Sequence, residues 1–385
     1  MDAGLDSLLQ ERLLELCGAN RLRRLRPWHW QNGALHDATG RALIDASSND
    51  YLGLSQHPLV KTRAAEWAER HGAGAPASRL VTGTRDITLA VEEKLARFKG
   101  CEAALLFSTG FQANATVVPA LAGLDDTATL FSDELNHASI VHGCRLARAR
   151  TQVFRHLDLD HLEQLLGGST GRKLILTESV FSMDGDRADL PALVQLAERH
   201  GAALYVDEAH SSGVLGPQGR GLAAECGGVD VVMGTLGKAF GAFGAYIAGS
   251  RLLIDYLVNR CSGFIYTTAL PPAVLGAVDA ALELIPTMDG ERHRLAAHGQ
   301  RLRHALAALG LDTLESTTQI VPAVIGSEVD TLAAAARLEA AGILAVAIRP
   351  PTVAPGTSRL RFALSTALAE PEMDRLLAAL PTIRS

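Results

Sequence analysis

A single lysine among glycines and small residues is a candidate reactive group in this sequence. Lys238 lies within Met-Gly-Thr-Leu-Gly-Lys-Ala-Phe-Gly, residues 233–241, directly after an apolar run. A lysine can form a Schiff base with an aldehyde if its amine loses its proton at working pH, which burial and a cationic neighbourhood favour. The flanking glycines let the backbone approach a bound molecule closely. A lysine between glycines is also common as a solvated loop charge, so the choice between these two roles depends on other segments of the chain.

An acid and a histidine follow a second apolar run, residues 203–206. Burying Asp207 at the mouth of an apolar strand costs free energy unless a cation or hydrogen-bond donors meet the carboxylate, and a protonated pyridine nitrogen is one such cation. Asp207 and His210 also have the spacing of a metal site, but the sequence has no matching Cys/His pair elsewhere, so we predict no metal. For Glu208 we expect a solvated surface charge.

Three further loops carry polar groups after apolar runs. Residues 108–114, Ser-Thr-Gly-Phe-Gln-Ala-Asn, lead into an expected helix, whose free backbone N–H groups could hold a phosphate, although a simple Ser/Thr cap is an equal alternative. His137 follows residues 128–131 and, taken alone, could be a capping or core histidine, and Glu178 and Ser182 follow residues 173–177. Together with the lysine and the aspartate, these groups are the set that pyridoxal 5'-phosphate (PLP) needs.

The elements that must position these loops alternate between short apolar runs and helix-length segments. This alternation predicts a mostly parallel sheet covered by helices. The expected strands are residues 103–107, 128–131, 173–177, 203–206, 230–233 and 244–248. The last two are close enough to form an antiparallel hairpin flanking Lys238. Because open α/β sheets bind ligands at the carboxyl ends of their strands, we expect the polar loops to meet at one edge.

The two ends of the chain predict smaller elements. The N-terminal part suggests an amphipathic helix over residues 4–18, a basic run 21–27 and a hairpin 34–46 with its turn at 37–40. The arginines of the basic run form either a solvated helix face or a clamp for carboxylate or phosphate. A long helical region, interrupted at Pro286, ends near residue 309. The remainder predicts strands near 312, 344–348 and 358–365, with helices at 331–341 and the C-terminus.

Length and composition limit the class of protein. With 385 residues, 48% apolar and 20% charged, the chain suits a globular protein of more than one domain. We expect an N-terminal segment 1–46, a large domain 47–285 and a small α+β domain 286–385. A net charge of −6 argues against a nucleic-acid partner. Five scattered cysteines, no secretory signal and no membrane-length apolar run predict reduced thiols, no membrane and a cytoplasmic location.

Six motifs in order resemble the α-oxoamine synthase family of fold-type I PLP enzymes across nearly the whole chain. They are residues 47–54, 108–114, 136–139, 178–186, 207–210 and 235–238. The resemblance implies an aminotransferase-like α/β fold and condensation of an amino acid with an acyl thioester, releasing CO2 and CoA. Residues 347–353 and 356–361 are most similar to members that join L-alanine to a pimeloyl thioester, on CoA or a carrier protein, in biotin synthesis. Ala75 and Pro76 replace the family's flexible glycines and serines, which bears on loop flexibility.

The resemblance also implies roles for residues around the cofactor. Lys238 would anchor PLP and act as the general base, and Asp207 would keep the pyridine nitrogen protonated. His137 would stack on the ring, while His210, with support from Ser182, would bind its phenolic oxygen. The phosphate would be bound by residues from two copies of the chain. The resemblance therefore implies a homodimer with the active site at its interface. These residues are Gly110, Phe111 and Thr235 of one copy and Thr267 and Thr268 of the other.

Four residues are implied to bind substrate. Arg349 would clamp the amino-acid carboxylate near Asn49, and Arg23 would meet the distal carboxylate of the pimeloyl chain. Glu178 lies at a neighbouring strand end, and its role is the least defined of the four. Siblings such as glycine C-acetyltransferase or 5-aminolevulinate synthase share the cofactor motifs. An aminotransferase would instead convert alanine to pyruvate without CoA, and a non-enzymatic scaffold or regulator would lack the lysine or the aspartate.

Overall fold

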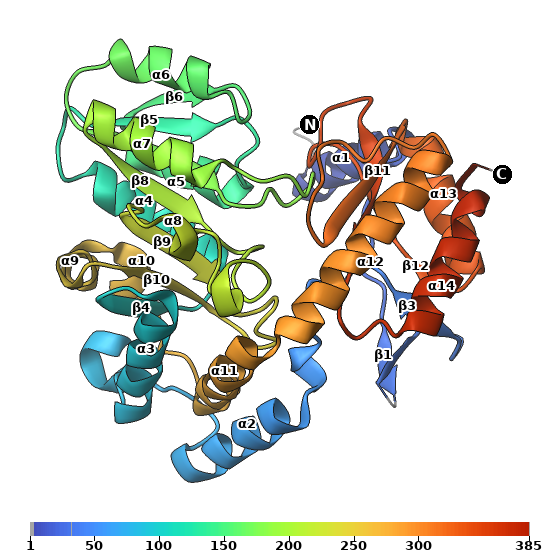
Figure 1. Ribbon diagram of the computed structural model, residues 1–385, viewed down its shortest axis with the longest axis horizontal. Coiled ribbons are helices and arrows are strands. Elements are labelled where there is room, and N and C mark those ends of the chain that lie inside the picture. Colours follow the sequence, from blue (N-terminus) through green and yellow to red (C-terminus); the bar gives the residue numbers. More distant parts are fainter. Residues whose placement is uncertain (1–3, 32, 385) are drawn as a thin grey trace. The chain divides into compact units, whose positions relative to one another are not determined.

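The computed structural model describes residues 4–31 and 33–384, which form two compact units (Figure 1). Unit 1 contains the chain up to Ser48, Met183–Asp186 and the chain from Leu295 onward. Unit 2 contains Asn49–Ser182 and Arg187–Arg294. The N-terminal segment therefore shares a unit with the C-terminal region. The domain boundaries expected after residues 46 and 285 remain predictions, because compact units are defined by contacts and not by independent folding.

Unit 2 is built on the expected mostly parallel sheet. Its strands lie in the order β4-β10-β9-β8-β7-β5-β6. Only β10 runs antiparallel, to both β9 and β4, so Lys238 lies in a hairpin connection as predicted. The strand bounds are β4 (Ala103–Phe107), β5 (Thr129–Asp133), β6 (Arg150–Phe154), β7 (Lys173–Glu178), β8 (Ala202–Asp207), β9 (Val231–Thr235) and β10 (Ala245–Gly249).

Strand β6 was not predicted. Its sequence, Arg-Thr-Gln-Val-Phe, contains no apolar run, and Arg150, Thr151 and Val153 are exposed. It pairs only with β5, at the edge of the sheet. An edge strand buries little of its surface, so the hydrophobic signal that identifies a central strand is missing.

Both faces of this sheet are buried, which explains why its central strands are apolar throughout. Leu174 and Leu176 of β7 belong to one core cluster, whereas Ile175 between them belongs to the other. Val231 and Val232 of β9 divide in the same way. Alternate side chains of a strand point to opposite faces, so burial on both sides requires a continuous apolar run.

Ten helices cover or flank the sheet within the described part of unit 2. Figure 1 shows α6 and α7 beside β6 and β8, and α3 beside β4. The bounds are α2 (Pro58–His71), α3 (Asp86–Lys99), α4 (Gly110–Ala122), α5 (Ala138–Ala147), α6 (Leu159–Gly167), α7 (Leu190–His200), α8 (Ala223–Cys226), α9 (Arg251–Arg260), α10 (Ser262–Ile265) and α11 (Pro272–Leu284). As predicted, Pro286 interrupts the following helical region, and α12 (Asp289–Ala308) runs on into unit 1.

Unit 1 contains two small sheets. The expected hairpin is present, and Asp37 closes its turn by accepting from the backbone N–H groups of Thr39 at 2.9 Å and Arg41 at 3.1 Å. The strand expected over 344–348 divides, because β12 pairs with β3 and β13 pairs with β14. The strand bounds are β1 (His29–Gln31), β2 (Ala34–His36), β3 (Ala42–Asp45), β11 (Ile320–Gly326), β12 (Ile343–Leu344), β13 (Val346–Ile348) and β14 (Ser358–Ala363).

In the part of unit 1 that the structure describes, three further α-helices are present: α1 (Leu5–Gly18), α13 (Glu328–Ala340) and α14 (Glu370–Ala379). Helix α1 forms where the leucine pattern predicted it, but none of its residues is buried. Its apolar side therefore contributes nothing to the core of the described chain. None of the helices in the described ranges combines the length and the hydropathy that crossing a bilayer requires.

Candidate active site

The polar loops meet at one edge of the sheet of unit 2, as the strand pattern predicted. Glu178, the last residue of β7, lies in register with Asp207, the last residue of β8. Asp207 in turn lies in register with Met233 of β9, and the loop after β9 carries Lys238. The carboxyl ends of neighbouring parallel strands thus bring these side chains together.

The amine of Lys238 contacts the imidazole of His210. The distance from Lys238 Nζ to His210 Nε2 is 2.9 Å. On the other side of the ring, His210 Nδ1 lies 2.6 Å from the hydroxyl of Tyr51, which donates to Asn49 Oδ1 at 3.0 Å. His210 and Tyr51 are buried, whereas Lys238 is half-buried. The amine of the lysine therefore lies against an imidazole nitrogen, and its side chain is partly open to solvent.

Asp207 is the buried anion of the site, only 4% exposed. Its Oδ1 accepts from the backbone N–H of Ala209 at 2.8 Å, and its Oδ2 accepts from Asn114 Nδ2 at 2.8 Å. Each carboxylate oxygen has two lone pairs, so the pair of oxygens keeps capacity for a further donor. A buried carboxylate with this remaining acceptor capacity suits a cation such as a pyridinium.

His137 caps the next helix and has a defined tautomer. The backbone N–H of Ser139, in the first turn of α5, donates to His137 Nδ1 at 3.2 Å, and the Ser139 hydroxyl lies 2.7 Å from the same nitrogen. Because Nδ1 accepts, the proton of the neutral ring is on Nε2. The side chain is exposed on its open side, yet the protein behind it desolvates the ring and lowers the pKa of His137, and Lys238 lowers it further against the opposing effect of Asp207. A neutral ring with an open face suits stacking.

Glu178 and Ser182, which follow the same apolar run, are both buried. Glu178 Oε1 accepts from the backbone N–H of His137 at 2.6 Å. Burial, and next the charge of Asp207, raise the pKa of Glu178 well above the ordinary value of a glutamate. The protonated form of Glu178 is therefore more favourable than that of an exposed glutamate, and its Oε1 is already engaged by the backbone of His137.

The start of α4 has both features that the sequence offered as alternatives, a side-chain helix cap and free backbone N–H groups. The Thr109 hydroxyl caps the helix by accepting from the N–H of Gln112 at 3.1 Å. Within the described chain, the N–H groups of Gly110 and Phe111 donate to no protein acceptor. A Cβ at Gly110 would lie 2.7 Å from Thr235 Cγ2, so only glycine lets the helix start approach that strand end. Free N–H groups beside a hydroxyl suit a phosphate.

These groups fit PLP. The start of α4, where only glycine fits, faces the threonine of β9. A buried carboxylate keeps free acceptor capacity, and an amine contacts an imidazole nitrogen. An imidazole with one open face completes the set. A phosphate, a pyridine nitrogen, an aldehyde and an aromatic ring each have a matching group in unit 2.

Thr267 and Thr268 are placed differently from these groups. Both follow α10, and Thr268 forms an isolated antiparallel bridge with Ser78. No hydrogen bond described within one copy of the chain joins either threonine to Gly110 or Thr235. Their predicted contribution to the site of a second copy stays a prediction.

The two predicted arginines lie together in unit 1. Arg349 donates to the backbone oxygen of Asn20, and Arg23 Nη2 donates to Thr352 Oγ1 at 3.4 Å. Burial and the neighbouring Arg23 lower the pKa of Arg349, against the opposing charge of Glu328. Two neighbouring guanidinium groups repel each other, so binding of an anion beside them is favourable.

The basic run is not a helix face, contrary to one of the two expectations. Helix α1 ends at Gly18, and residues 21–28 have no regular structure. Arg21 pairs with Glu328 at 2.7 Å, and Arg26 pairs with Glu339 at 2.5 Å. These two arginines attach the segment to α13, whereas Arg23 between them is exposed.

Glu208 is not a solvated charge, which corrects the prediction from its polar surroundings. The side chain is 0% exposed and forms an ion pair with Lys99, which is also buried. Glu208 Oε1 accepts from the N–H of Ala223 at 2.8 Å and from the hydroxyl of Ser211 at 3.2 Å. The ion pair therefore fixes the turn that carries Asp207 and His210.

Removing Lys99 should destabilise unit 2 strongly. Lys99→Met leaves the Glu208 carboxylate buried without its cation, which we expect to cost about 3–5 kcal/mol of unfolding free energy. Urea unfolding of the two proteins measures the difference. The matched control is Arg97→Met on the same helix, because its pair with Glu93 is exposed and should contribute at most about 0.5 kcal/mol. Equal effects of the two substitutions would contradict the prediction.

Three residues that hold the site together were not predicted: Tyr51, Asn114 and Ser139. Each lies inside a motif that carried the family resemblance, so the sequence contained them without indicating a role. Asn114 Nδ2 donates both to Asp207 and, at 2.9 Å, to the hydroxyl of Ser139, which contacts His137. These buried links join two predicted cofactor residues.

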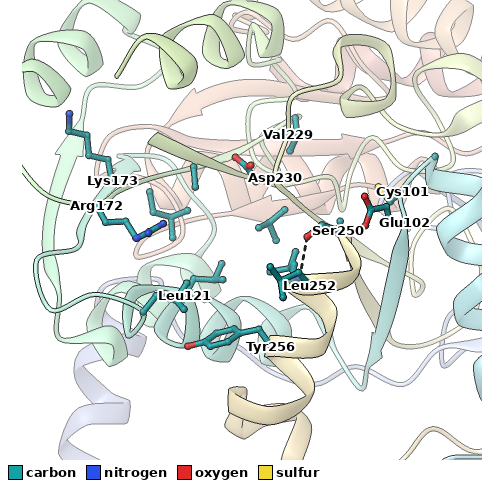
Figure 2. Close-up of a pocket in the computed structure, with 17 residues that line it drawn as sticks. Cys101, Glu102, Leu121, Arg172, Lys173, Val229, Asp230, Ser250, Leu252 and Tyr256 are labelled. Carbon is teal, nitrogen blue, oxygen red and sulfur yellow. Dashed lines mark hydrogen bonds between the residues drawn. The ribbon is translucent and has the colours of Figure 1, made fainter. Parts of the chain in front are cut away.

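A cavity of about 820 Å³ lies at the opposite edge of the same sheet (Figure 2). Its lining includes Lys173 and Val231, the first residues of β7 and β9. Figure 2 shows the side chain of Arg172 reaching into it across from Asp230. Glu102 and Asp230 already accept from the backbone N–H groups of Arg251 and Leu204. None of the predicted site residues lines this cavity.

Comparisons with known proteins agree with the geometry. The family model "Aminotransferase class I and II" matches residues 41–380. A relative from Bordetella pertussis is 58% identical and covers 98% of this chain and 96% of its own. A relative from Gluconacetobacter diazotrophicus, 54% identical over 97% of this chain and 96% of its own, is named 8-amino-7-oxononanoate synthase.

Two solved structures show the same fold. A serine palmitoyltransferase from S. paucimobilis with a bound PLP–myriocin aldimine has a TM-score of 0.89 and 28% identity, covering 97% of this chain and 96% of that one. An 8-amino-7-oxononanoate synthase from Francisella tularensis has a TM-score of 0.77 and 28% identity, covering 89% and 96%.

Proposed function

The chain belongs to the aminotransferase class I and II family and is a PLP-dependent enzyme of the acyltransferase kind; from this premise we propose that it makes 8-amino-7-oxononanoate. The substrates would be L-alanine and a pimeloyl thioester, carried on CoA or on a carrier protein, and the other products CO2 and the free thiol. The observation that carries the proposal is the contact of Lys238 with His210 beside the buried carboxylate of Asp207.

Residues of unit 2 would hold the cofactor. The N–H groups of Gly110 and Phe111 and the hydroxyl of Thr235 suit its phosphate, and Asp207 suits its ring nitrogen. Others would bind the ring face and the phenolic oxygen, namely His137, His210 and Ser182. When bound, PLP supplies an electron sink for the negative charge that develops at the amino-acid Cα.

The side chains of the chain itself handle the proton. The amine of Lys238 would take a proton from the substrate Cα, and His210 Nε2, 2.9 Å from that amine, would share it. Asn114 and Ala209 donate to the Asp207 carboxylate, whose charge would favour a protonated ring nitrogen beside it. When protonated, Glu178 would be able to donate to a substrate oxygen without adding charge.

Substrate recognition would use carboxylate chemistry. Arg349 suits the carboxylate of alanine together with Asn49, and Arg23 suits the distal carboxylate of the pimeloyl chain, because guanidinium groups bind carboxylates bidentately. Thr267 and Thr268 of a second copy would complete the phosphate site, so the active unit would be a homodimer. The similarity to relatives named 8-amino-7-oxononanoate synthase supports this product over the products of sibling synthases.

A thiol-release assay tests this function. The PLP-loaded protein is incubated with alanine, glycine or serine and with pimeloyl, acetyl or succinyl-CoA, and free CoA is measured. We expect alanine with pimeloyl-CoA to have the highest kcat/KM, and CoA release to depend on the amino acid. A preference for another pair would contradict the assignment of substrates. Pyruvate formation from alanine without CoA would instead indicate an aminotransferase.

A further inference from the structure

Tyr51 is a buried tyrosine between two residues of the candidate site. Its side chain is 0% exposed, and its ring lies 6.0 Å from the ring of His210, centroid to centroid. Its hydroxyl donates to Asn49 Oδ1 at 3.0 Å and lies 2.6 Å from His210 Nδ1. Buried hydroxyl groups form hydrogen bonds, and Asn49 and His210 are two partners of this one.

The direction of these bonds determines the tautomer of His210. A tyrosine hydroxyl has one proton, and here that proton is donated to Asn49 Oδ1. The same oxygen can then serve His210 only as an acceptor, so Nδ1 must carry the ring proton. A neutral imidazole has a single N–H group, which leaves a lone pair on Nε2. That nitrogen faces Lys238 Nζ at 2.9 Å.

In the other tautomer, His210 could not accept a proton from Lys238. With its proton on Nε2, the ring would present an N–H group to an ammonium that can only donate. With its proton on Nδ1, the ring can accept a proton from Lys238. We propose that Tyr51 is a positioning residue that holds His210 in the Nδ1–H tautomer and so makes Nε2 the proton acceptor of Lys238.

The proposed step transfers one proton from Lys238 to His210. One N–H bond of the Lys238 ammonium breaks, an N–H bond forms at His210 Nε2, and the positive charge moves to the imidazolium. The lysine is left as the neutral amine, the form that reacts with an aldehyde. The catalytic use of this transfer rests on the proposed function, whereas the tautomer can be measured without cofactor.

Nitrogen NMR of the histidine rings tests the tautomer directly. Full-length, cofactor-free protein is labelled with 15N-histidine, and long-range 1H–15N correlations distinguish protonated from unprotonated ring nitrogens. The chain has 13 histidines, so the His210→Gln variant identifies the signals of His210. We expect the wild-type ring to have a protonated Nδ1 and an unprotonated Nε2.

Two variants should move the proton for different reasons. Tyr51→Phe removes the acceptor of the Nδ1 proton, and Asn49→Leu removes the acceptor of the tyrosine's proton, which then turns toward Nδ1. Both should shift the proton of His210 to Nε2. The control is Tyr246→Phe, which removes a fully buried hydroxyl that contacts Ser212 at 2.8 Å, and it should leave the His210 signals unchanged.

A second measurement connects the tautomer to the lysine. When cofactor-free protein is mixed with PLP, absorbance follows covalent attachment, and Tyr51→Phe should slow it by up to about 100-fold, the lower end of what positioned general bases contribute. A wild-type His210 protonated on Nε2, or an unmoved proton in both variants, would overturn the proposal. If the proton moves as expected but no thioester substrate releases CoA, the proposed function fails while the role of Tyr51 stands.

Discussion

Replacing Lys238 by alanine should abolish covalent attachment of PLP and lower kcat/KM by at least about 10³-fold, because one side chain would provide both the anchor and the general base. His210 would keep its place on Tyr51 and could not substitute, since it lacks an amine that condenses with an aldehyde. The measurement is borohydride reduction of the PLP-loaded protein, followed by peptide mapping and the thiol-release assay.

The control for Lys238→Ala is Lys173→Ala. Lys173 belongs to the same sheet, but at the opposite edge, where its amine donates to the backbone oxygen of His200 at 3.2 Å. Its loss should change neither the labelled peptide nor kcat/KM by more than about twofold, as for most surface substitutions. Recovery of the label on a peptide without residue 238, in the wild-type protein, would show that Lys238 is not the anchor.

The central sheet could be predicted because its strands are buried on both faces. Continuous apolar runs identified β4, β5, β7, β8, β9 and β10, and the short connection between the last two indicated the hairpin around Lys238. The same logic missed β6, whose exposed edge position removes the apolar run. Hydrophobic patterns report burial, so they locate central strands and not edges.

The candidate site divides in a similar way. Asp207 ends β8, and His210 and Lys238 lie in the loops after β8 and β9, so topology alone brings them together. The prediction that Glu208 is solvated was wrong because its partner Lys99 lies 109 residues earlier in the chain. Tyr51 and Asn114 also act through distant partners, His210 and Asp207. Side chains that support a site through one long-range hydrogen bond leave no periodic or local signal in the sequence.

Replacing Asp207 by asparagine should lower kcat by about 10²–10³-fold, the effect of removing one preorganised electrostatic group. The substitution keeps the shape of the side chain and removes its charge. Both described partners of the carboxylate, Asn114 Nδ2 and the N–H of Ala209, are donors, so the new amide group must turn its own N–H toward one of them. We therefore also expect a loss of about 1–3 kcal/mol of unfolding free energy from the unsatisfied donors.

A double variant separates the charge from the hydrogen bond. Combining Asp207→Asn with Asn114→Asp restores one amide and one carboxylate facing each other, and Tyr205 can still donate to the oxygen at position 114, as it does now at 2.6 Å. The free energy of unfolding, measured with urea, should then be partly restored. In contrast, kcat should stay low because the carboxylate has moved away from the end of β8. Recovery of both quantities would mean that the site needs a carboxylate nearby but not at Asp207. Full activity of Asp207→Asn alone would show that this charge does not stabilise the cofactor ring.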